Sequence, residues 1–112
     1  MSQKRPVLPE KPTLGDLQAD IAALVKERGW DNETPTDIML LMIEEVGELA
    51  KEVRKTTHLT IDKTRASTYR SEMAHELADV LNYLMALANA YNINLEQAYR
   101  DKQVEVEKRN WS

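Results

Sequence analysis

The sequence contains no cysteine, no phenylalanine and only three glycines among its 112 residues. The absence of cysteine excludes disulfide bonds and metal sites with thiolate ligands. No segment approaches the roughly 20 consecutive apolar residues needed to cross a bilayer, so we expect a cytoplasmic protein without a membrane partner. Three of the four prolines lie within the polar first twelve residues, which lack the apolar run of a signal peptide. We therefore predict a flexible N-terminal leader over residues 1–12 and one folded domain over residues 13–112.

The composition is that of a folded, helical protein. Hydrophobic residues make up 42% of the chain and charged residues 30%, which is ordinary for a globular domain. Alanine, leucine, glutamate and lysine are plentiful, and these residues favour helices. The net charge of −4 and the pI near 5.2 argue against binding to nucleic-acid polymers.

Capping residues and apolar periodicity predict four helices and no strands. Thr13 with Asp16, and Thr34 before Pro35, are typical helix starts, while Gly29 is a typical helix stop. The segment over residues 56–68 has many hydroxyl groups and no clear period, and it is predicted to be a loop, with closure over a substrate as its suggested role. The predicted helices run from about residue 14 to 28, 35 to 55, 69 to 91 and 95 to 109.

The predicted fold class is all-α, a four-helix bundle-like domain completed by homo-oligomerisation. The second and third helices contain enough Leu, Met, Ile and Val to pack on copies of themselves. Because a chain of this length would otherwise leave apolar surface exposed, we expect a homo-oligomer, most simply a two-fold dimer. A self-sufficient monomer is the alternative.

The stretch "LMIEEVGELAKEV", residues 41–53, places carboxylates where a helix should face the core. Glu45 follows Leu41 by four residues and Met42 by three, so it shares their side of the helix. Glu48 lies three residues further along. An unpaired buried carboxylate is costly, so a compensating charge is expected. The apolar stripe itself consists of Ile38, Leu41, Met42, Leu49 and Val53.

The next predicted helix repeats this pattern, with Glu76 and Asp79 three residues apart beside Leu77 and Val80. Two facing helices that each carry such a pair can gather four anionic oxygen donors at one point. A hard divalent cation would remove their mutual repulsion, and ligation by oxygen alone favours Mg²⁺ or, as a substitute, Mn²⁺. The alternative is that both pairs lie on solvated helix faces.

Three neighbouring features allow other interpretations. Glu44 is turned about 100° from Glu45, so it could contact a base or a neighbouring subunit. Glu52 could extend the acidic strip, although nearby lysines favour a solvated side chain. The segment from Glu72 to His75 matches the Glu-x-x-His element of di-iron bundles, but such sites need a second copy, which the sequence lacks.

The motif "EEVGE", followed after 27 residues by "ELAD", resembles the Glu-Glu-x-x-Glu and Glu-x-x-Asp pattern of MazG-like nucleotide pyrophosphohydrolases. The likeness covers most of the chain. It implies an all-α enzyme, a homodimer or homotetramer, that hydrolyses (d)NTPs to (d)NMP and pyrophosphate with Mg²⁺. A role in nucleotide-pool house-cleaning follows from the same resemblance, whereas the base preference depends on the shape of a pocket.

The resemblance assigns roles to residues by position. Lys102 and Arg109, seven residues apart, are similar to basic residues near the phosphates, whereas without the resemblance surface charge on a polar helix is the preferred explanation. Where the family often has an asparagine and an aromatic residue, this chain has Val106 and Asn110. The implied metal ligands are Glu45, Glu48, Glu76 and Asp79.

Three further residues are candidates for contacts with the substrate's base or sugar. Trp30 matches a tryptophan near the base pocket of relatives, and it could instead plug the end of the bundle. Asn82 and Tyr83 follow Asp79 by about one turn, with packing as the alternative for Tyr83. Glu44 or Glu48 would accept the proton of the attacking water. The competing function is a non-catalytic helical assembly or regulatory protein whose acidic faces meet solvent.

Overall fold

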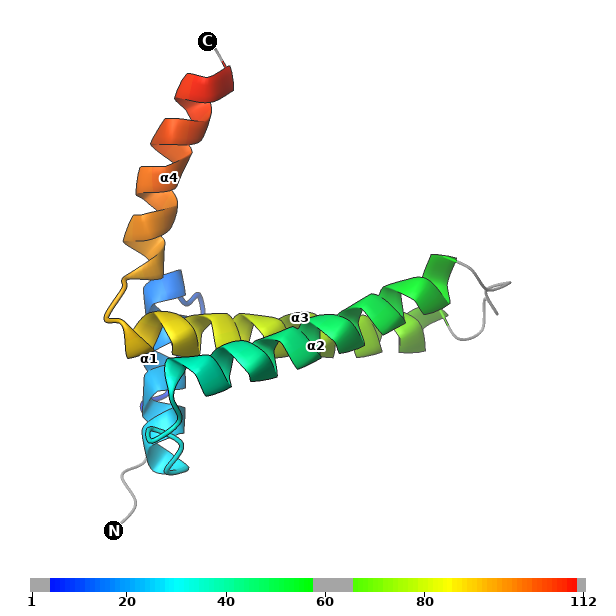
Figure 1. The fold of residues 1–112 in the computed structure, drawn as a ribbon, viewed down its shortest axis with the longest axis horizontal. Coiled ribbons are helices and arrows are strands. Elements are labelled where there is room, and N and C mark those ends of the chain that lie inside the picture. Colours follow the sequence, from blue (N-terminus) through cyan, green and yellow to red (C-terminus); the bar gives the residue numbers. More distant parts are fainter. Residues whose placement is uncertain (1–4, 58–65, 111–112) are drawn as a thin grey trace. The chain divides into compact units, whose positions relative to one another are not determined.

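The computed structural model describes residues 5–57 and 66–110, and in this part of the chain it contains helices and no strands (Figure 1). The predicted all-α class is therefore confirmed. No helix within the described ranges is long and apolar enough to cross a membrane. The helices are α1 (Leu14–Glu27), α2 (Pro35–Thr57), α3 (Ala66–Ala90) and α4 (Leu95–Asn110).

The predicted helix starts are formed by reciprocal caps. Thr13 Oγ1 accepts from the Asp16 amide at 3.1 Å, and Asp16 Oδ2 accepts from the Thr13 amide at 2.9 Å. Thr34 and Asp37 form the same pair of bonds at the start of α2, both at 3.1 Å. Each cap satisfies amides that the first helical turn leaves without an internal partner.

The ends of α1 and α3 share one geometry. Gly29 has a φ of 70° and Asn92 a φ of 56°, the left-handed conformation that glycine and asparagine adopt most readily. The residue after each donates its amide back into the helix, Trp30 to the Val25 carbonyl and Ile93 to Ala88, both at 2.9 Å. The chain direction after each helix is therefore fixed locally.

The predicted loop over residues 56–68 is wrong at both ends, because α2 continues to Thr57 and α3 begins at Ala66. At the first end, Thr56 Oγ1 donates to the Val53 carbonyl at 2.7 Å, and Thr57 Oγ1 donates to the same carbonyl at 3.3 Å. These bonds satisfy the hydroxyl groups inside a helix, so a threonine-rich sequence does not end it. Residues 58–65 and their suggested closing motion lie outside the described residues.

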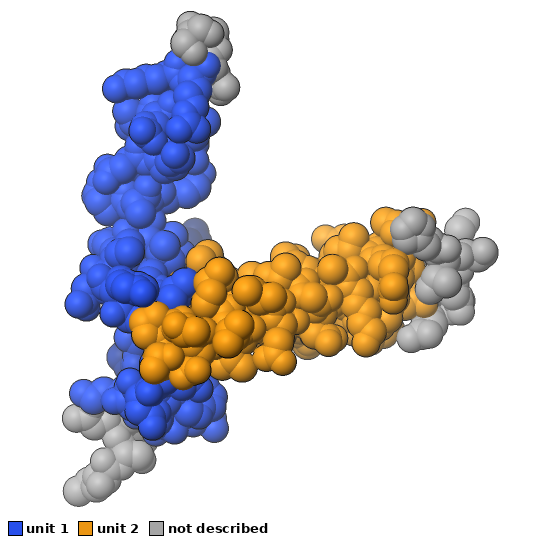
Figure 2. Space-filling model, viewed as in Figure 1, with its two compact units in different colours: residues 1–33, 85–112 blue, residues 34–84 orange. Residues whose placement is uncertain are grey.

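The chain divides into two compact units, each described by itself (Figure 2). The first comprises residues 1–33 and 85–112, in which the starts of α1 and α4 contact each other. Its buried apolar residues are Ile21, Met85 and Ala88. Arg5 Nη2 also lies 2.8 Å from Asp20 Oδ2 on α1.

The second unit, residues 34–84, is an antiparallel hairpin of α2 and most of α3 (Figure 1). Among its described residues only Ile38 is buried. Leu77, Leu81 and Leu84, which periodicity alone groups with the core, are 53%, 36% and 42% exposed. The sequence pattern marks these leucines as apolar but does not say which neighbour covers them.

Several apolar residues of this hairpin are exposed, and they recur every three or four positions from Leu40 to Val46 on α2 and from Leu77 to Leu84 on α3. We call these exposed apolar residues of the hairpin together the apolar face. It consists of Met39, Leu40, Ile43, Val46 and Val53 on α2 and Leu77, Leu81 and Leu84 on α3.

Candidate metal centre

Three carboxylates from the two helices of the hairpin converge on one point. Glu45 comes from α2, and Glu76 and Asp79 come from successive turns of α3. One oxygen of each lies within 4.8 Å of the others. Glu45 and Glu76 are half-buried, so these charges are not simply spread over a solvated surface. The structure thus brings together three of the four predicted metal ligands.

The electrostatics of this cluster are unfavourable when it is left uncompensated. Burial raises the pKa of Glu45 above its ordinary value, and a hydrogen bond with Glu76 raises it further. The negative charges of Asp79, Glu76 and Glu48 act in the same direction. In addition, Glu76 Oε2 is buried and has no hydrogen-bond partner among the described residues. A carboxylate oxygen in this state needs a cation or a donor.

These residues fit a hard divalent cation. The donors are all carboxylate oxygens, which suit Mg²⁺ and Mn²⁺, and a cation would satisfy the buried Glu76 oxygen. Within the described ranges, this is the only group of three or more possible ligands, and it contains no histidine. His75 is exposed and lies outside the group, so the arrangement lends no support to the di-iron alternative.

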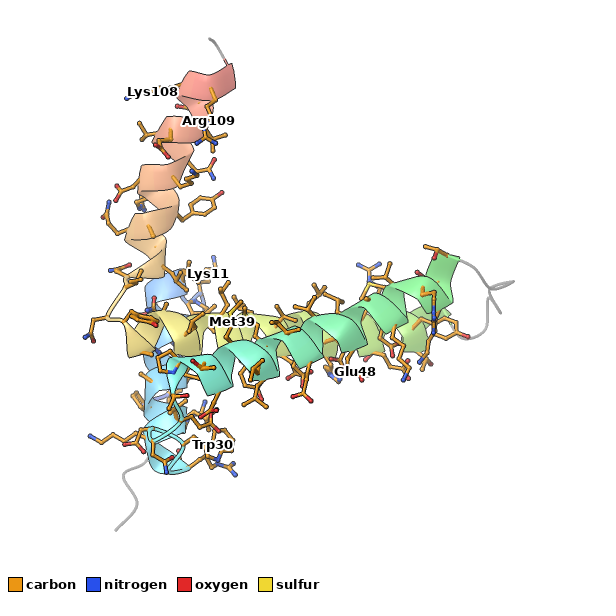
Figure 3. The ribbon with its side chains drawn as sticks, viewed as in Figure 1. Lys11, Trp30, Met39, Glu48, Lys108 and Arg109 are labelled. Carbon is orange, nitrogen blue, oxygen red and sulfur yellow. The ribbon has the colours of Figure 1, made fainter. Side chains whose placement is uncertain are left out.

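The remaining acidic candidates surround the cluster in different ways. Glu48 and Glu44 are both exposed, and Glu48 projects from a different edge of α2 than Met39 (Figure 3). Glu48 lies outside the group of three, although its charge acts on Glu45. The expectation of a solvated Glu52 is wrong, since its side chain is 12% exposed and Lys55 Nζ lies 3.0 Å from its Oε1. The lysine bonds one oxygen of this carboxylate, while its Oε2 is, like Glu76 Oε2, buried without a hydrogen-bond partner among the described residues.

The candidates for base contacts fall in both units. Asn82 is exposed and Tyr83 half-buried on α3, about one turn beyond Asp79. Trp30 belongs to the first unit, and the residue is 48% exposed although its amide is bonded to the Val25 carbonyl (Figure 3). A half-exposed aromatic ring on a fixed backbone is suited to stacking.

The two basic candidates, Lys102 and Arg109, lie on α4, in the first unit, and both are exposed. Figure 3 labels Arg109 near the end of this helix. Lys102 Nζ lies 3.0 Å from Glu105 Oε2 one turn away, and both side chains are more than half exposed. Such a surface pair contributes at most about 1 kcal/mol, so a phosphate group can displace Glu105 from the lysine at little cost.

Sequence reasoning missed one residue of the first unit. Gln18 on α1 is 8% exposed and is the only buried polar residue in the part of the chain that the structure describes. It contacts Asn89, Ile93 and Leu95. The only sequence signal is a glutamine beside Leu17 and three residues before Ile21, on the apolar side of an amphipathic helix.

The raised pKa of Glu45 gives a pH prediction for the metal-free protein. Because the folded state holds this proton more tightly than the unfolded state, the group destabilises the fold increasingly as the pH rises from the ordinary pKa of a glutamate to its raised pKa in the folded protein. Glu45→Gln should therefore raise the melting temperature at neutral pH, and this advantage should shrink as the pH falls and disappear below the ordinary pKa of a glutamate. Thermal unfolding in a chelating buffer measures this difference. An advantage that grows on acidification would contradict it.

Comparison with known proteins gives a family and several relatives. The family model for the MazG nucleotide pyrophosphohydrolase domain matches residues 33–110. The uncharacterized protein YpjD of Bacillus subtilis (strain 168) is 34% identical over 88 residues, 78% of this chain and 77% of that protein. The dCTP pyrophosphatase 1 proteins of Homo sapiens and Mus musculus are each 34% identical over 94 residues. That match covers 82% of this chain and 55% of each mammalian protein, so the chain spans about half their length.

Proposed function

Because the chain belongs to the family of MazG nucleotide pyrophosphohydrolase domains, we propose that it hydrolyses nucleoside triphosphates to monophosphates and pyrophosphate with Mg²⁺. The observation that carries this proposal is the convergence of Glu45, Glu76 and Asp79, with one buried oxygen of Glu76 unpaired among the described residues. The relatives named for dCTP make dCTP the first substrate to test. A house-cleaning role in the nucleotide pool accords with such an activity.

Each candidate residue has a part in this reaction. Glu45, Glu76 and Asp79 would hold the metal, with Glu48 as a fourth ligand beside them. A bound Mg²⁺ supplies positive charge that offsets the charge of the phosphates and of the transition state. This charge also explains how an acidic protein can accept a polyanion.

The chemical step needs a base and a leaving group. Water attacks the α-phosphorus, a new P–O bond forms, and the bond to the bridging oxygen breaks as pyrophosphate leaves. Glu44 or Glu48 accepts the water proton, since both are exposed carboxylates next to the metal ligands on α2. Lys102 and Arg109 bind the phosphates, while Trp30, Asn82 and Tyr83 contact the base or sugar.

The test is to incubate the protein with Mg²⁺ and a panel of canonical and modified (d)NTPs and to separate the products by chromatography. Monophosphate with pyrophosphate is the expected result, and the relative rates rank the bases. Diphosphate with orthophosphate as products would be compatible with the metal site but would show that water does not attack the α-phosphorus. No turnover by a folded protein would favour the non-catalytic helical assembly instead.

We also propose that the apolar face packs against a second copy of the chain, in a homodimer or as part of a homotetramer. The hairpin of residues 34–84 has only Ile38 buried among its described residues, too little for two helices to remain folded by themselves. Large apolar patches on soluble proteins typically mark interaction sites. A self-associating hairpin would obtain the missing core from its copy.

Gly47 offers a sensitive probe of this association. It lies within α2 close to Ile43 on the helix surface, and a Cβ added there would meet nothing within 4 Å in the single chain. In a single chain without a partner, Gly47→Ala should therefore stabilise α2 by roughly 0.5–1 kcal/mol. If a second copy packs here, the added methyl group should instead weaken association, which sedimentation at decreasing protein concentration measures. Gly15→Ala is the control, because its Cβ would make only ordinary contacts, at 3.6 and 3.9 Å.

A further inference from the structure

Lys55 is the one basic residue of the hairpin that is not exposed, among those that the structure describes there. The exposed basic residues are Lys51, Arg54, Arg70 and His75. Lys55 Nζ donates to Glu52 Oε1 at 3.0 Å, and the two side chains are 38% and 12% exposed. The ammonium group therefore lies between a largely buried carboxylate and solvent, where a ligand can reach it.

The ammonium group of Lys55 has hydrogen-bonding capacity left over. A lysine carries three N–H donors, and within the described ranges Lys55 uses one of them, for Glu52. The hydrogen bond with Glu52 raises the pKa of Lys55 above its ordinary value, and the charges of Glu52 and Glu72 act in the same direction. The group therefore keeps its positive charge near neutral pH and has two donors for an anion.

Lys55 and Glu52 lie farther along the hairpin than the carboxylate cluster, towards the end of α2 (Figure 1). Glu52 follows Glu45 by seven residues on α2, which is about two turns or roughly 10 Å. Glu72 precedes Glu76 by four residues on α3, and because the helices are antiparallel, both steps lead in the same direction. The bond to Glu52, three positions earlier, turns the ammonium group of Lys55 back towards the cluster.

The candidate contacts for the base lie on the opposite side of the cluster. Asn82 follows Asp79 by three residues on α3, away from Glu72. A triphosphate whose α-phosphorus lies at the metal has its sugar and base on one side and its two other phosphates on the other. With the base near Asn82, those two phosphates extend along the hairpin towards Lys55. All these residues belong to the same compact unit, so their order does not depend on the other unit.

We propose that Lys55 binds the pyrophosphate part of the substrate, donating to an oxygen of the β- or γ-phosphate while Glu52 holds its ammonium group in place. This inference rests on the proposed function, because it takes the cluster as the place where the α-phosphorus is attacked. Lys55 balances the charge of Glu52, so a phosphate here meets a neutral pair. Glu72 still repels the phosphate, which makes the positive charge of the lysine necessary at this position.

The test measures binding of inorganic pyrophosphate in the presence of Mg²⁺ by isothermal titration calorimetry, in Lys55→Gln and in Lys51→Gln. In Lys55→Gln the Kd should rise by about tenfold, the effect expected when one hydrogen bond between charged groups is lost. Lys51 is exposed and lies one turn nearer to the cluster on the same helix, so Lys51→Gln removes the same charge nearby. Its Kd should stay within about twofold of the wild-type value, because exposed charges without a direct contact are screened by solvent and salt.

A double variant separates phosphate binding from the support that Lys55 gives to Glu52. Lys55→Gln leaves the largely buried carboxylate unpaired and should also lower the melting temperature. In Glu52→Gln/Lys55→Gln neither charge remains, so the melting temperature should recover, whereas pyrophosphate binding should stay weak. Recovery of the wild-type Kd in the double variant would show that the lysine serves Glu52 alone, and would overturn the inference.

Binding of the monophosphate product gives a second check. A nucleoside monophosphate has no β- or γ-phosphate, so its Kd should be the same in Lys55→Gln and in the wild type. Equal weakening for the monophosphate and for pyrophosphate would indicate a general loss of the site, and would also overturn the inference.

Failure of the proposed function would look different. A wild-type protein that binds Mg²⁺ and pyrophosphate but hydrolyses no nucleotide would overturn the enzymatic proposal, while the Kd values of the variants would still decide the role of Lys55. A wild-type protein that hydrolyses nucleotides, with an unchanged pyrophosphate Kd in Lys55→Gln, would leave the proposed function standing and refute the part of Lys55 in it.

Discussion

Glu76→Gln is expected to lower nucleotide hydrolysis by roughly a hundredfold to a thousandfold while leaving the protein folded. A bound metal supplies several kcal/mol of transition-state stabilisation, and each 1.4 kcal/mol corresponds to about a factor of ten in rate. The amide keeps the shape of the side chain but removes its charge and one oxygen donor. Release of monophosphate from dCTP or the best substrate of the panel, at saturating nucleotide, measures the loss.

The matched control is Glu27→Gln, which makes the same chemical change at an exposed position at the end of α1. Its turnover should equal that of the wild type. Mg²⁺ should raise the melting temperature of the wild type and of Glu27→Gln. The rise should be much smaller for Glu76→Gln, because a ligand that binds the folded state more weakly stabilises it less. Full activity of Glu76→Gln would show that Glu76 is not a metal ligand needed for hydrolysis.

Ile43→Glu should convert the protein from an oligomer into a monomer or an unfolded chain. In the single chain Ile43 is 53% exposed, and a surface substitution at such a position typically changes stability by less than about 0.5 kcal/mol. Within an interface the same carboxylate would be buried without a partner, which costs several kcal/mol. The two situations therefore predict effects of very different size. Size-exclusion chromatography with light scattering, together with thermal unfolding, measures both.

Val104→Glu is the control for this experiment, since Val104 is 55% exposed but lies on α4, outside the apolar face. It should leave the oligomeric state unchanged. A wild-type protein that is monomeric at high concentration would contradict the proposed association directly. An Ile43→Glu protein that remains oligomeric and as stable as the wild type would show that the apolar face is not the interface.

The local architecture could be predicted because its causes are local. Thr13 and Thr34 form the predicted caps with an aspartate three residues later, and Gly29, the predicted helix stop, follows α1 with a positive φ. The prediction of a loop beginning at residue 56 was wrong, because a hydroxyl-rich sequence there indicates irregular structure. Helical backbone carbonyls satisfy those hydroxyl groups, and composition does not distinguish the two outcomes.

The candidate site was predictable to the level of helix faces. Spacing of three residues placed Glu76 beside Asp79, and the interruption of an apolar stripe marked Glu45. That the three oxygens meet within 4.8 Å requires the antiparallel register of α2 and α3, which spacing within each helix does not contain. The bond between Glu52 and Lys55 is local instead, because the two residues lie three positions apart on α2.

The sequence by itself determined the four helices, most of their ends, the acidic pairs and the absence of any thiolate chemistry. These follow from capping, period and residue chemistry within one or two turns of chain. Only the tertiary structure decided that Glu76 carries a buried, unpaired oxygen, that leucines of α3 face outward, and that Gln18 links α1 to the start of α4. Such facts depend on which residues far apart in the chain become neighbours, and burial or pairing has no meaning until those neighbours are present.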